Sequence, residues 1–213
     1  MPRCCRYHGV MLTLDTIRAR LAQHAPPAIP TDTTSRRAAV AVILRAPHNA
    51  AAPPEVLFIK RGEHDGDPWS GHMAFPGGHA DETDPSLTAT AIRETWEEIG
   101  LDLNTHGQLI GRIEHEQAAP PSRPAGMLVA PFVFAITSTP ELVLSSEVAE
   151  VVWAPLQRIV IAADHTRQQR YGRGALGNFP GYLVGNGHFV WGLTYRMVHT
   201  FLRAVEPAWQ PPE

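Results

Sequence analysis

Residues 77–101 read GGHADETDPSLTATAIRETWEEIGL, and this stretch contains the strongest structural signals in the chain. It predicts a helix from Pro85 to Ile99. Asp84 is a suitable N-cap because its carboxylate can accept hydrogen bonds from free backbone N–H groups, and Pro85 occupies the favoured first helical position. Gly100 stands just past the end, where a left-handed residue commonly terminates a helix.

The predicted helix has two different faces, because 3.6 residues make one turn. One side carries apolar side chains that we expect to face the core, namely Ile92, Trp96 and Ile99. The other side carries three acidic side chains, which stack at spacings of three and four residues, namely Glu94, Glu97 and Glu98.

This acidic side is unfavourable for a purely structural helix. Like charges at these spacings repel by roughly 0.2–0.5 kcal/mol per pair, and Glu97 and Glu98 also lie in the last turn, where the helix dipole disfavours carboxylates. A divalent cation removes both penalties, and hard oxygen ligands suit Mg²⁺ or Mn²⁺. The preceding Pro-Gly-Gly loop lets a backbone carbonyl approach the same point, and Arg93 can orient a carboxylate. A solvated acidic face is the alternative interpretation.

The composition suits a globular chain with one domain. The 213 residues are 44% apolar and 18% charged. A formal net charge of −3 gives no basic face for a long nucleic acid, and no apolar run reaches the roughly 20 residues that span a bilayer. Cys4 and Cys5 are the only cysteines, so a disulfide framework is excluded and a reducing cytoplasm is the simplest compartment.

We expect three regions in the chain: an N-terminal extension with a short helix over 1–30, a single domain over 31–206 and a tail over 207–213. The first ten residues differ in character from the rest of the chain, so either translation starts at Met11 or they form a disordered extension.

Helical and strand patterns mix without strict alternation, which favours an α/β sandwich with a mixed sheet. The expected helices cover 15–24, 85–99 and 192–204, with a short one after 156. The expected strands cover 38–44, 56–60, 72–75, 109–113, 129–136 and 150–153, followed by a hairpin of 182–184 and 188–190 around a Gly-Asn-Gly turn. Residues 172–178 are expected to be loop.

The stretch from Gly77 to Leu101 resembles the Nudix box, whose core reads Gly-x5-Glu-x7-Arg-Glu-U-x-Glu-Glu-x-Gly-U. The second half fits at every polar position, although Thr95 replaces the usual apolar residue. The first half departs: fourteen residues instead of thirteen separate Gly78 from Arg93, and the first Glu is absent. Asp84 stands at the position of this first Glu when residues are counted forward from Gly78. An N-cap role for Asp84 is an equal alternative.

The resemblance implies an α/β/α sandwich with a mixed sheet and a Mg²⁺-dependent pyrophosphohydrolase. It implies metal ligation by Glu94, Glu97, Glu98 and the carbonyl of Gly78. Glu94 would bridge metals or help to deprotonate water, and Arg93 would hold it. The substrate would be a nucleotide-derived small molecule.

Further residues are similar to the coenzyme A diphosphatase branch of the family, including Phe75-Pro76-Gly77-Gly78 and Trp191-Gly192-Leu193-Thr194. Residues 67–70 depart from that branch. The resemblance implies cleavage of coenzyme A to 3′,5′-ADP and 4′-phosphopantetheine. Three alternatives stay open: another substrate such as ADP-ribose or a nucleoside triphosphate, a non-catalytic ligand-binding Nudix domain, and an acidic helix without chemistry. A homodimer is compatible with all of them.

Residues outside the box supply further candidates, each with a structural alternative. Glu147 is a candidate metal ligand or a surface glutamate. Lys60, Arg61 and His72 are candidates for phosphate contacts, against a charged strand end and a structural hydrogen bond. His115 could be a general base but loop histidines are more often exposed, and Trp69 could stack on a base or fill the core.

Overall fold

The computed structural model describes residues 11–30, 36–46, 53–63, 69–118, 126–136, 138, 140–172 and 175–213. The expected N-terminal extension over 1–10, with both cysteines, lies outside these ranges. Residues 47–52, 64–68 and 119–125 also lie outside these ranges. No helix within the described ranges has the length and apolar character needed to cross a membrane.

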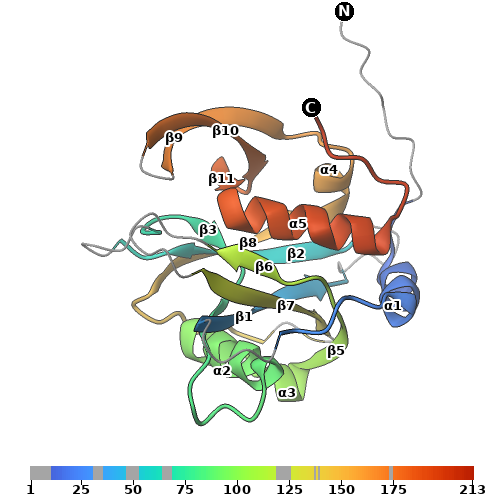
Figure 1. Ribbon diagram of the computed structural model, residues 1–213, viewed down its shortest axis with the longest axis vertical. Coiled ribbons are helices and arrows are strands. Elements are labelled where there is room, and N and C mark those ends of the chain that lie inside the picture. Colours follow the sequence, from blue (N-terminus) through green and yellow to red (C-terminus); the bar gives the residue numbers. More distant parts are fainter. Residues whose placement is uncertain are drawn as a thin grey trace, which may run out of the picture.

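Within these ranges, a mixed sheet of eight strands forms the centre of the fold (Figure 1). Its long central strands, β1 (Arg36–Arg45) and β7 (Met127–Ile136), pair in parallel along their whole length. The other pairings are antiparallel, so the predicted mixed sheet is confirmed. The remaining strands are β2 (Glu55–Arg61), β3 (Met73–Ala74), β4 (Gly77–His79), β5 (Gly107–Arg112), β6 (Glu116–Ala118) and β8 (Val148–Pro155).

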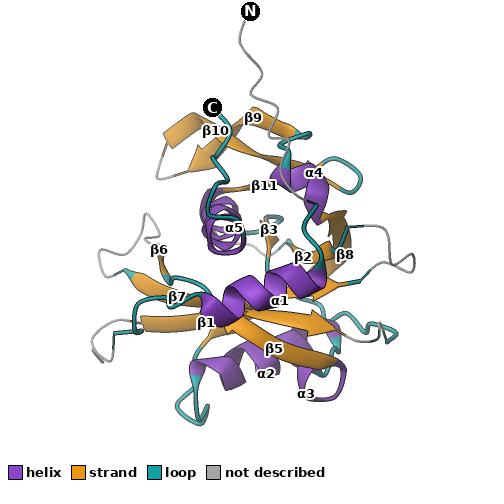
Figure 2. Cartoon of the chain, turned by 90° about the vertical axis from the view of Figure 1, so that its right-hand side faces the viewer, coloured by secondary structure: helices purple, strands orange, loops and turns teal. Residues whose placement is uncertain are grey.

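A smaller antiparallel sheet lies on one side of the main sheet, with helix α5 (Gly192–Val205) between them (Figures 1 and 2). It consists of β9 (His165–Gly172), β10 (Ala175–Val184) and β11 (His188–Trp191), and the predicted hairpin is confirmed by the pairing of β10 with β11. Helices α2 (Leu87–Ile99) and α3 (Leu103–His106) cover the opposite face. The chain also contains α1 (Leu14–Gln23) and α4 (Leu156–Val160).

The main sheet has a separate apolar core on each face, and strand β1 contributes to both because its side chains alternate. The core on the α5 side includes Val40, Val42 and Leu44. The core on the α2 side includes Ala39, Ala41 and Ile43. All six are buried, which explains why this strand is a nearly continuous apolar run in the sequence.

Two predictions about helix α2 are wrong. The helix begins at Leu87, not Pro85, and its N-cap is Ser86, whose hydroxyl accepts a hydrogen bond from the N–H of Ala89. Trp96 is 57% exposed and does not belong to the core. The side that packs on the sheet is rotated from the predicted one, and its buried residues are Thr90, Ala91, Thr95, Glu98 and Ile99.

The prediction of a loop over 172–178 is also wrong, because the described residues of this range belong to β9 and β10. These strands pair from Tyr182 with His165 to Ala175 with Gly172. The segment is rich in glycine and polar residues, so its sequence lacks the apolar alternation that marks a strand. Its extended conformation therefore depends on pairing between two strands rather than on local preference.

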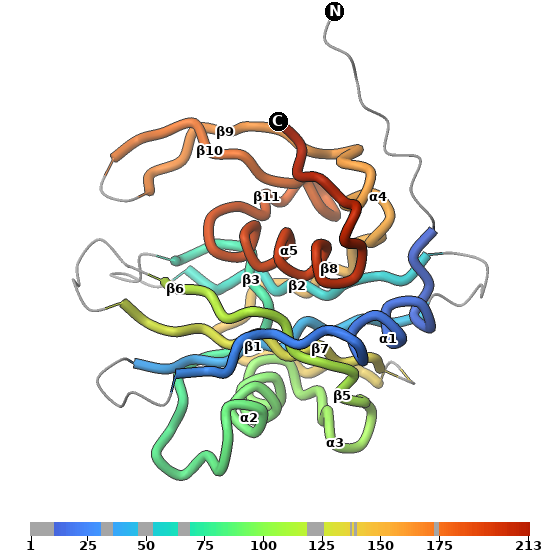
Figure 3. The backbone as a smooth tube through the Cα atoms, turned by 45° about the vertical axis from the view of Figure 1, so that its right-hand side comes forward, coloured from blue at the N-terminus to red at the C-terminus, as the bar shows by residue number. Residues whose placement is uncertain are grey.

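The C-terminal residues after α5 take part in the core. Figure 3 shows this stretch turning back beside α4. Trp209, in the region expected to be a tail, is 2% exposed and its indole N–H donates to the carbonyl of Val160 at 3.0 Å. Its ring also packs edge-on against His199 of α5. A large side chain thus joins the chain end to two helices.

We expect Trp209→Ala to lower the free energy of unfolding by roughly 3–5 kcal/mol, because it leaves a cavity and an unpaired carbonyl in the core. The matched control is Gln210→Ala, since Gln210 is exposed. Urea denaturation of both variants measures the difference. Equal midpoints for the two variants would show that the tail does not stabilise the domain.

Candidate active site

The C-terminal end of α2 is tied to a loop from another part of the chain. The carbonyls of Glu98 and Ile99 accept hydrogen bonds from the N–H groups of Ser145 and Val143 at 2.9 and 3.0 Å. These bonds satisfy acceptors that a helix end leaves free. They also bring Glu147, on the same loop, close enough for its charge to act on Glu98.

Two glycines bring the backbone against the glutamates of α2. The N–H of Gly77 donates to Glu98 Oε2 at 2.8 Å. Gly77 has a φ of +147°, and a Cβ there would lie 2.2 Å from the carbonyl oxygen of Ala39. A Cβ on Gly78 would lie 2.5 Å from the carboxylate of Glu94. Only glycine allows both approaches, since any side chain would collide with backbone or carboxylate.

Glu98 is the most unusual group at this point, because it is an acidic side chain that is only 3% exposed. Its pKa is raised to about 8, mainly by burial and also by the charges of Glu94 and Glu147, whereas the Gly77 N–H and the Arg61 charge lower it. The predicted acidic face is therefore divided: Glu98 belongs to the buried side of α2, whereas the Glu97 side chain is 54% exposed.

Glu94 and Glu147 complete a crowded group of negative charges. Burial raises the pKa of Glu94, and the charges of Glu97 and Glu147 raise it as well, although Arg93 lowers it. Glu147 is exposed, and the N–H of Gly62 donates to its carbonyl at 2.7 Å. The loop before β8 thus places a fourth carboxylate beside those of α2.

These residues fit a divalent cation, although no three His, Cys, Asp or Glu side chains in the described part of the chain form a ready-made cluster for one. Arg93 engages one oxygen of Glu94 and one of Glu97, and Gly77 engages one oxygen of Glu98. The space beside Gly78 that a Cβ would fill adjoins the carboxylate of Glu94. Clustered oxygen ligands with excess negative charge suit Mg²⁺ or Mn²⁺.

Arg93 links the helix to the loop before it. Its guanidinium binds both oxygens of Asp84 at 3.0 and 2.9 Å, and it donates to Glu94 and Glu97 at 2.9 Å each and to the carbonyl of His79 at 3.1 Å. Asp84 also accepts from the Thr90 hydroxyl. These hydrogen bonds hold the pKa of Asp84 far below its usual range, and the bonds from Arg93 have the largest effect.

Asp84 is therefore not the N-cap of α2 but the partner of Arg93. It stands where the Nudix box has its first Glu, counted forward from Gly78. The extra residue before Arg93 is absorbed by the loop, whose turn is closed by the N–H of Asp81 donating to Asp84. The sequence did indicate this role, because an acidic residue stands at the Glu position counted forward from Gly78. Sequence alone could not distinguish a partner of Arg93 from an N-cap.

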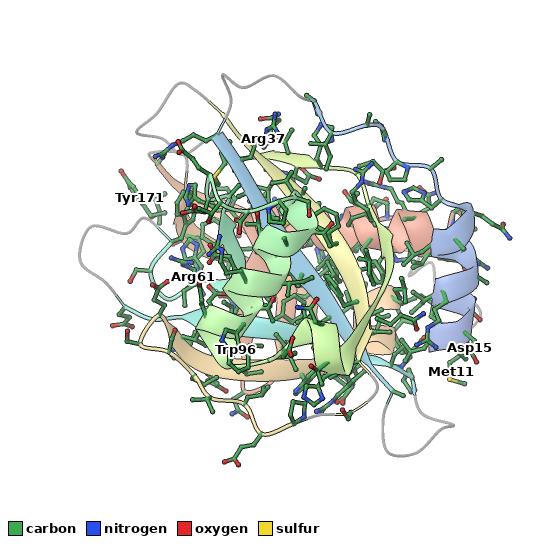
Figure 4. The ribbon with its side chains drawn as sticks, turned by 90° about the horizontal axis from the view of Figure 1, so that it is seen from below. Met11, Asp15, Arg37, Arg61, Trp96 and Tyr171 are labelled. Atoms are coloured by element: carbon green, nitrogen blue, oxygen red, sulfur yellow. The ribbon has the colours of Figure 1, made fainter. Side chains whose placement is uncertain are left out.

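Arg61 and Lys60 point to opposite sides of the main sheet. Strand alternation directs Lys60 to the α5 side, with Val56 and Phe58, and Arg61 to the α2 side. Figure 4 shows Arg61 beside α2, where its charge acts on Glu98. Lys60 is opposite Glu150 in the pairing of β2 with β8, away from the glutamates of α2.

Three other candidates lie in different places. The ring of His72 packs on Trp191 with centroids 4.8 Å apart, and Trp69 accepts a hydrogen bond at its carbonyl from the N–H of His72. His115 lies just before β6, which is separated from β4 and its two glycines by β7 and β1. The fold therefore does not bring His115 to the glutamates.

We expect Asp84→Asn to lower the free energy of unfolding by about 1–3 kcal/mol, because it weakens charge-assisted hydrogen bonds to Arg93. Glu82→Gln removes the same charge from an exposed residue of the same loop and is the control. Urea denaturation gives both values. A loss that is no larger for Asp84→Asn than for the control would contradict the role of the pair.

Glu98 also predicts how stability depends on pH without added metal. Its pKa is about 8 in the folded chain and 4.5 as the reference value, so the folded state binds the proton more tightly. The contribution of Glu98 is thus most favourable below about pH 4.5 and is lost as the pH rises to 8. Melting temperatures in a chelator should fall over this range, and Glu98→Gln should reduce the slope. An equal slope in both proteins would rule out this assignment.

Comparison with known proteins agrees with this arrangement. The family model for the NUDIX domain matches residues 35–173. The chain is 35% identical over 166 residues to an uncharacterised protein of Schizosaccharomyces pombe, covering 70% of this chain but 48% of that protein. This chain therefore spans about half the length of that relative.

Two further relatives have names that refer to hydrolases. One is the uncharacterised Nudix hydrolase NudL of Photorhabdus laumondii, 33% identical over 64% of this chain and 70% of that protein. The other is the peroxisomal coenzyme A diphosphatase ndx-8 of Caenorhabditis elegans, 33% identical over 45% of this chain and 40% of that protein.

The fold is also found among solved structures. A MutT/nudix family protein from Enterococcus faecalis matches with a TM-score of 0.51, over 92% of this chain and 70% of that chain, at 19% identity. At this identity the likeness shows the fold alone, and it confirms the predicted α/β/α sandwich. With the family model covering most of the chain and the box residues gathered around Gly77 and Gly78, the chain belongs to the Nudix hydrolase family.

Proposed function

We propose that this chain is a Mg²⁺-dependent pyrophosphohydrolase that cleaves the diphosphate bridge of a nucleoside diphosphate derivative, with coenzyme A as the first candidate substrate. The observation that carries the proposal is the buried carboxylate of Glu98, held by the Gly77 N–H and surrounded by the charges of Glu94 and Glu147. A purely structural helix gains nothing from this crowding, whereas a cation site requires it.

The proposed metal ligands are the side chains of Glu94, Glu97, Glu98 and Glu147 and the carbonyl of Gly78. A bound Mg²⁺ or Mn²⁺ would neutralise charge on the diphosphate oxygens and make the attacking water more acidic. Glu94 is also proposed to help deprotonate that water.

Arg93 would act as a positioning residue, because it holds one oxygen each of Glu94 and Glu97 while Asp84 holds its own guanidinium. Arg61 is the proposed contact for a phosphate oxygen on this side of the sheet. Lys60 is not included in this phosphate site, because it points to the other face.

Two observations support coenzyme A as the first candidate. One relative is named a coenzyme A diphosphatase, at 33% identity over less than half of either chain. The other is the Phe75-Pro76-Gly77-Gly78 stretch, which places both glycines against the glutamates. The expected products are 3′,5′-ADP and 4′-phosphopantetheine. ADP-ribose and nucleoside triphosphates belong to the same substrate panel.

The proposal predicts that Glu97→Gln and Glu98→Gln each lower turnover on the order of 100-fold or more while the protein stays folded. Product analysis with Mg²⁺, using coenzyme A, ADP-ribose and nucleoside triphosphates, measures the activity and identifies the preferred substrate. Glu141→Gln is the control, because Glu141 is an exposed glutamate. Full activity in both active-site variants would defeat the mechanism, and no turnover of any compound by the unaltered protein would favour a ligand-binding role.

A further inference from the structure

The C-terminal part of the chain has a charge opposite to that of the α2 site. Residues 165–205 contain five arginines and neither Asp nor Glu, although the whole chain has a net charge of −3. These residues form the smaller sheet and α5. A region with this balance has the charge to bind an anionic group.

Strand register separates the two faces of the smaller sheet. Residues opposite each other point to the same side, so the pairs His165 with Tyr182 and Tyr182 with Val190 define the face that packs on α5. We call the other face the arginine face. It carries Gln168, Arg170, Phe179 and Trp191, together with the glycines at 172, 177 and 181.

Among the residues that the structure describes, the hydrogen bonds of Arg170 go to neutral groups on this face. Its guanidinium donates to the side-chain oxygen of Gln168 at 2.6 Å and to the carbonyl of Gln169 at 3.1 Å, and both acceptors are neutral. It also lies over the ring of Phe189, with Cζ 5.2 Å from the centroid. A pre-positioned guanidinium whose described acceptors are neutral is suited to binding phosphate.

The arginine face reaches the α2 site through a short series of contacts. The rings of Phe179 and Trp191 lie 5.0 Å apart, and Trp191 contacts His72. The carbonyl of His72 accepts a hydrogen bond from the N–H of Arg61 at 3.0 Å, and the Arg61 charge acts on Glu98.

Aromatic side chains in the series of contacts between Arg170 and Arg61 indicate which part of a ligand this surface could bind. Phe179 and Trp191 are partly exposed, and both rings pack close to Gly172, where a Cβ would lie 2.9 Å from Phe179 and 3.1 Å from Trp191. A nucleotide base can stack on such rings, typically with a stabilisation of about 1–3 kcal/mol. A nucleotide with its diphosphate at the glutamates would therefore place its base and any further phosphate along this face.

We propose that the arginine face binds the nucleotide half of the substrate, with Trp191 stacking on the base and Arg170 binding a phosphomonoester on the ribose. This inference rests on the proposed function, and it adds a substrate class: nucleoside diphosphate derivatives that carry a further phosphate remote from the scissile bridge. Coenzyme A has such a phosphate, and its 3′-dephospho form lacks it.

Calorimetric titration with 3′,5′-ADP and with 5′-AMP tests the role of Arg170 without any turnover, because neither compound offers a substituted diphosphate to cleave. In Mg²⁺, the unaltered protein should bind 3′,5′-ADP roughly tenfold more tightly than 5′-AMP. Arg170→Gln should remove this preference. Arg167→Gln should keep it, since Arg167 belongs to the same strand, loses the same charge and points to the other face.

Trp191→Leu tests the stacking, and it should weaken the binding of both nucleotides by a similar factor while their ratio is kept. Melting temperatures of all variants are measured alongside. Equal binding of both nucleotides by the unaltered protein, or a preference that persists in Arg170→Gln, would overturn the inference. The inference would also be overturned if Arg170→Gln weakened the binding of 3′,5′-ADP and of 5′-AMP equally, because an equal loss of affinity indicates a structural role. Turnover of coenzyme A is assayed separately, so a failure of the proposed function is distinguishable.

Discussion

The burial of the Glu98 carboxylate is the constraint on which the rest of the site depends. Removing a negative charge from water is costly unless hydrogen bonds or opposite charges compensate it. Here one backbone N–H from Gly77 and the charge of Arg61 oppose the cost, but Glu94 and Glu147 increase it. The site therefore remains short of positive charge. The loop of two glycines, the end of α2 and the loop before β8 thus all shape the surroundings of one buried carboxylate.

The pair of Asp84 and Arg93 shows how the chain tolerates a departure from the Nudix box. An additional residue in the loop and the loss of the first Glu could have left Arg93 without its partner. The loop instead bends so that the shorter Asp84 side chain meets the guanidinium with both oxygens. Helix α2 begins at Leu87 with Ser86 as its N-cap, and Asp84, two residues before Ser86, binds Arg93 instead.

The main sheet separates two kinds of chemistry. Its α2 side holds the carboxylates and Arg61, whereas its α5 side adjoins a sheet and a helix without acidic side chains. Strand β2 contributes to both sides because neighbouring residues on a strand point in opposite directions. For this reason Lys60 and Arg61, adjacent in sequence, lie on opposite sides of the sheet.

The sequence by itself determined the mixed sandwich, the strands β1 and β2, the helix that carries the glutamates and the glycines before it, because these depend on local periodicity and close-range turns. Only the tertiary structure decided which side of α2 is buried, since Trp96 and Glu98 exchange their expected environments when the helix packs on the sheet. It also decided the partner of Asp84, the strands over 165–184 and the position of Glu147. These depend on contacts between residues far apart in the chain, where neither spacing nor propensity indicates which surfaces meet.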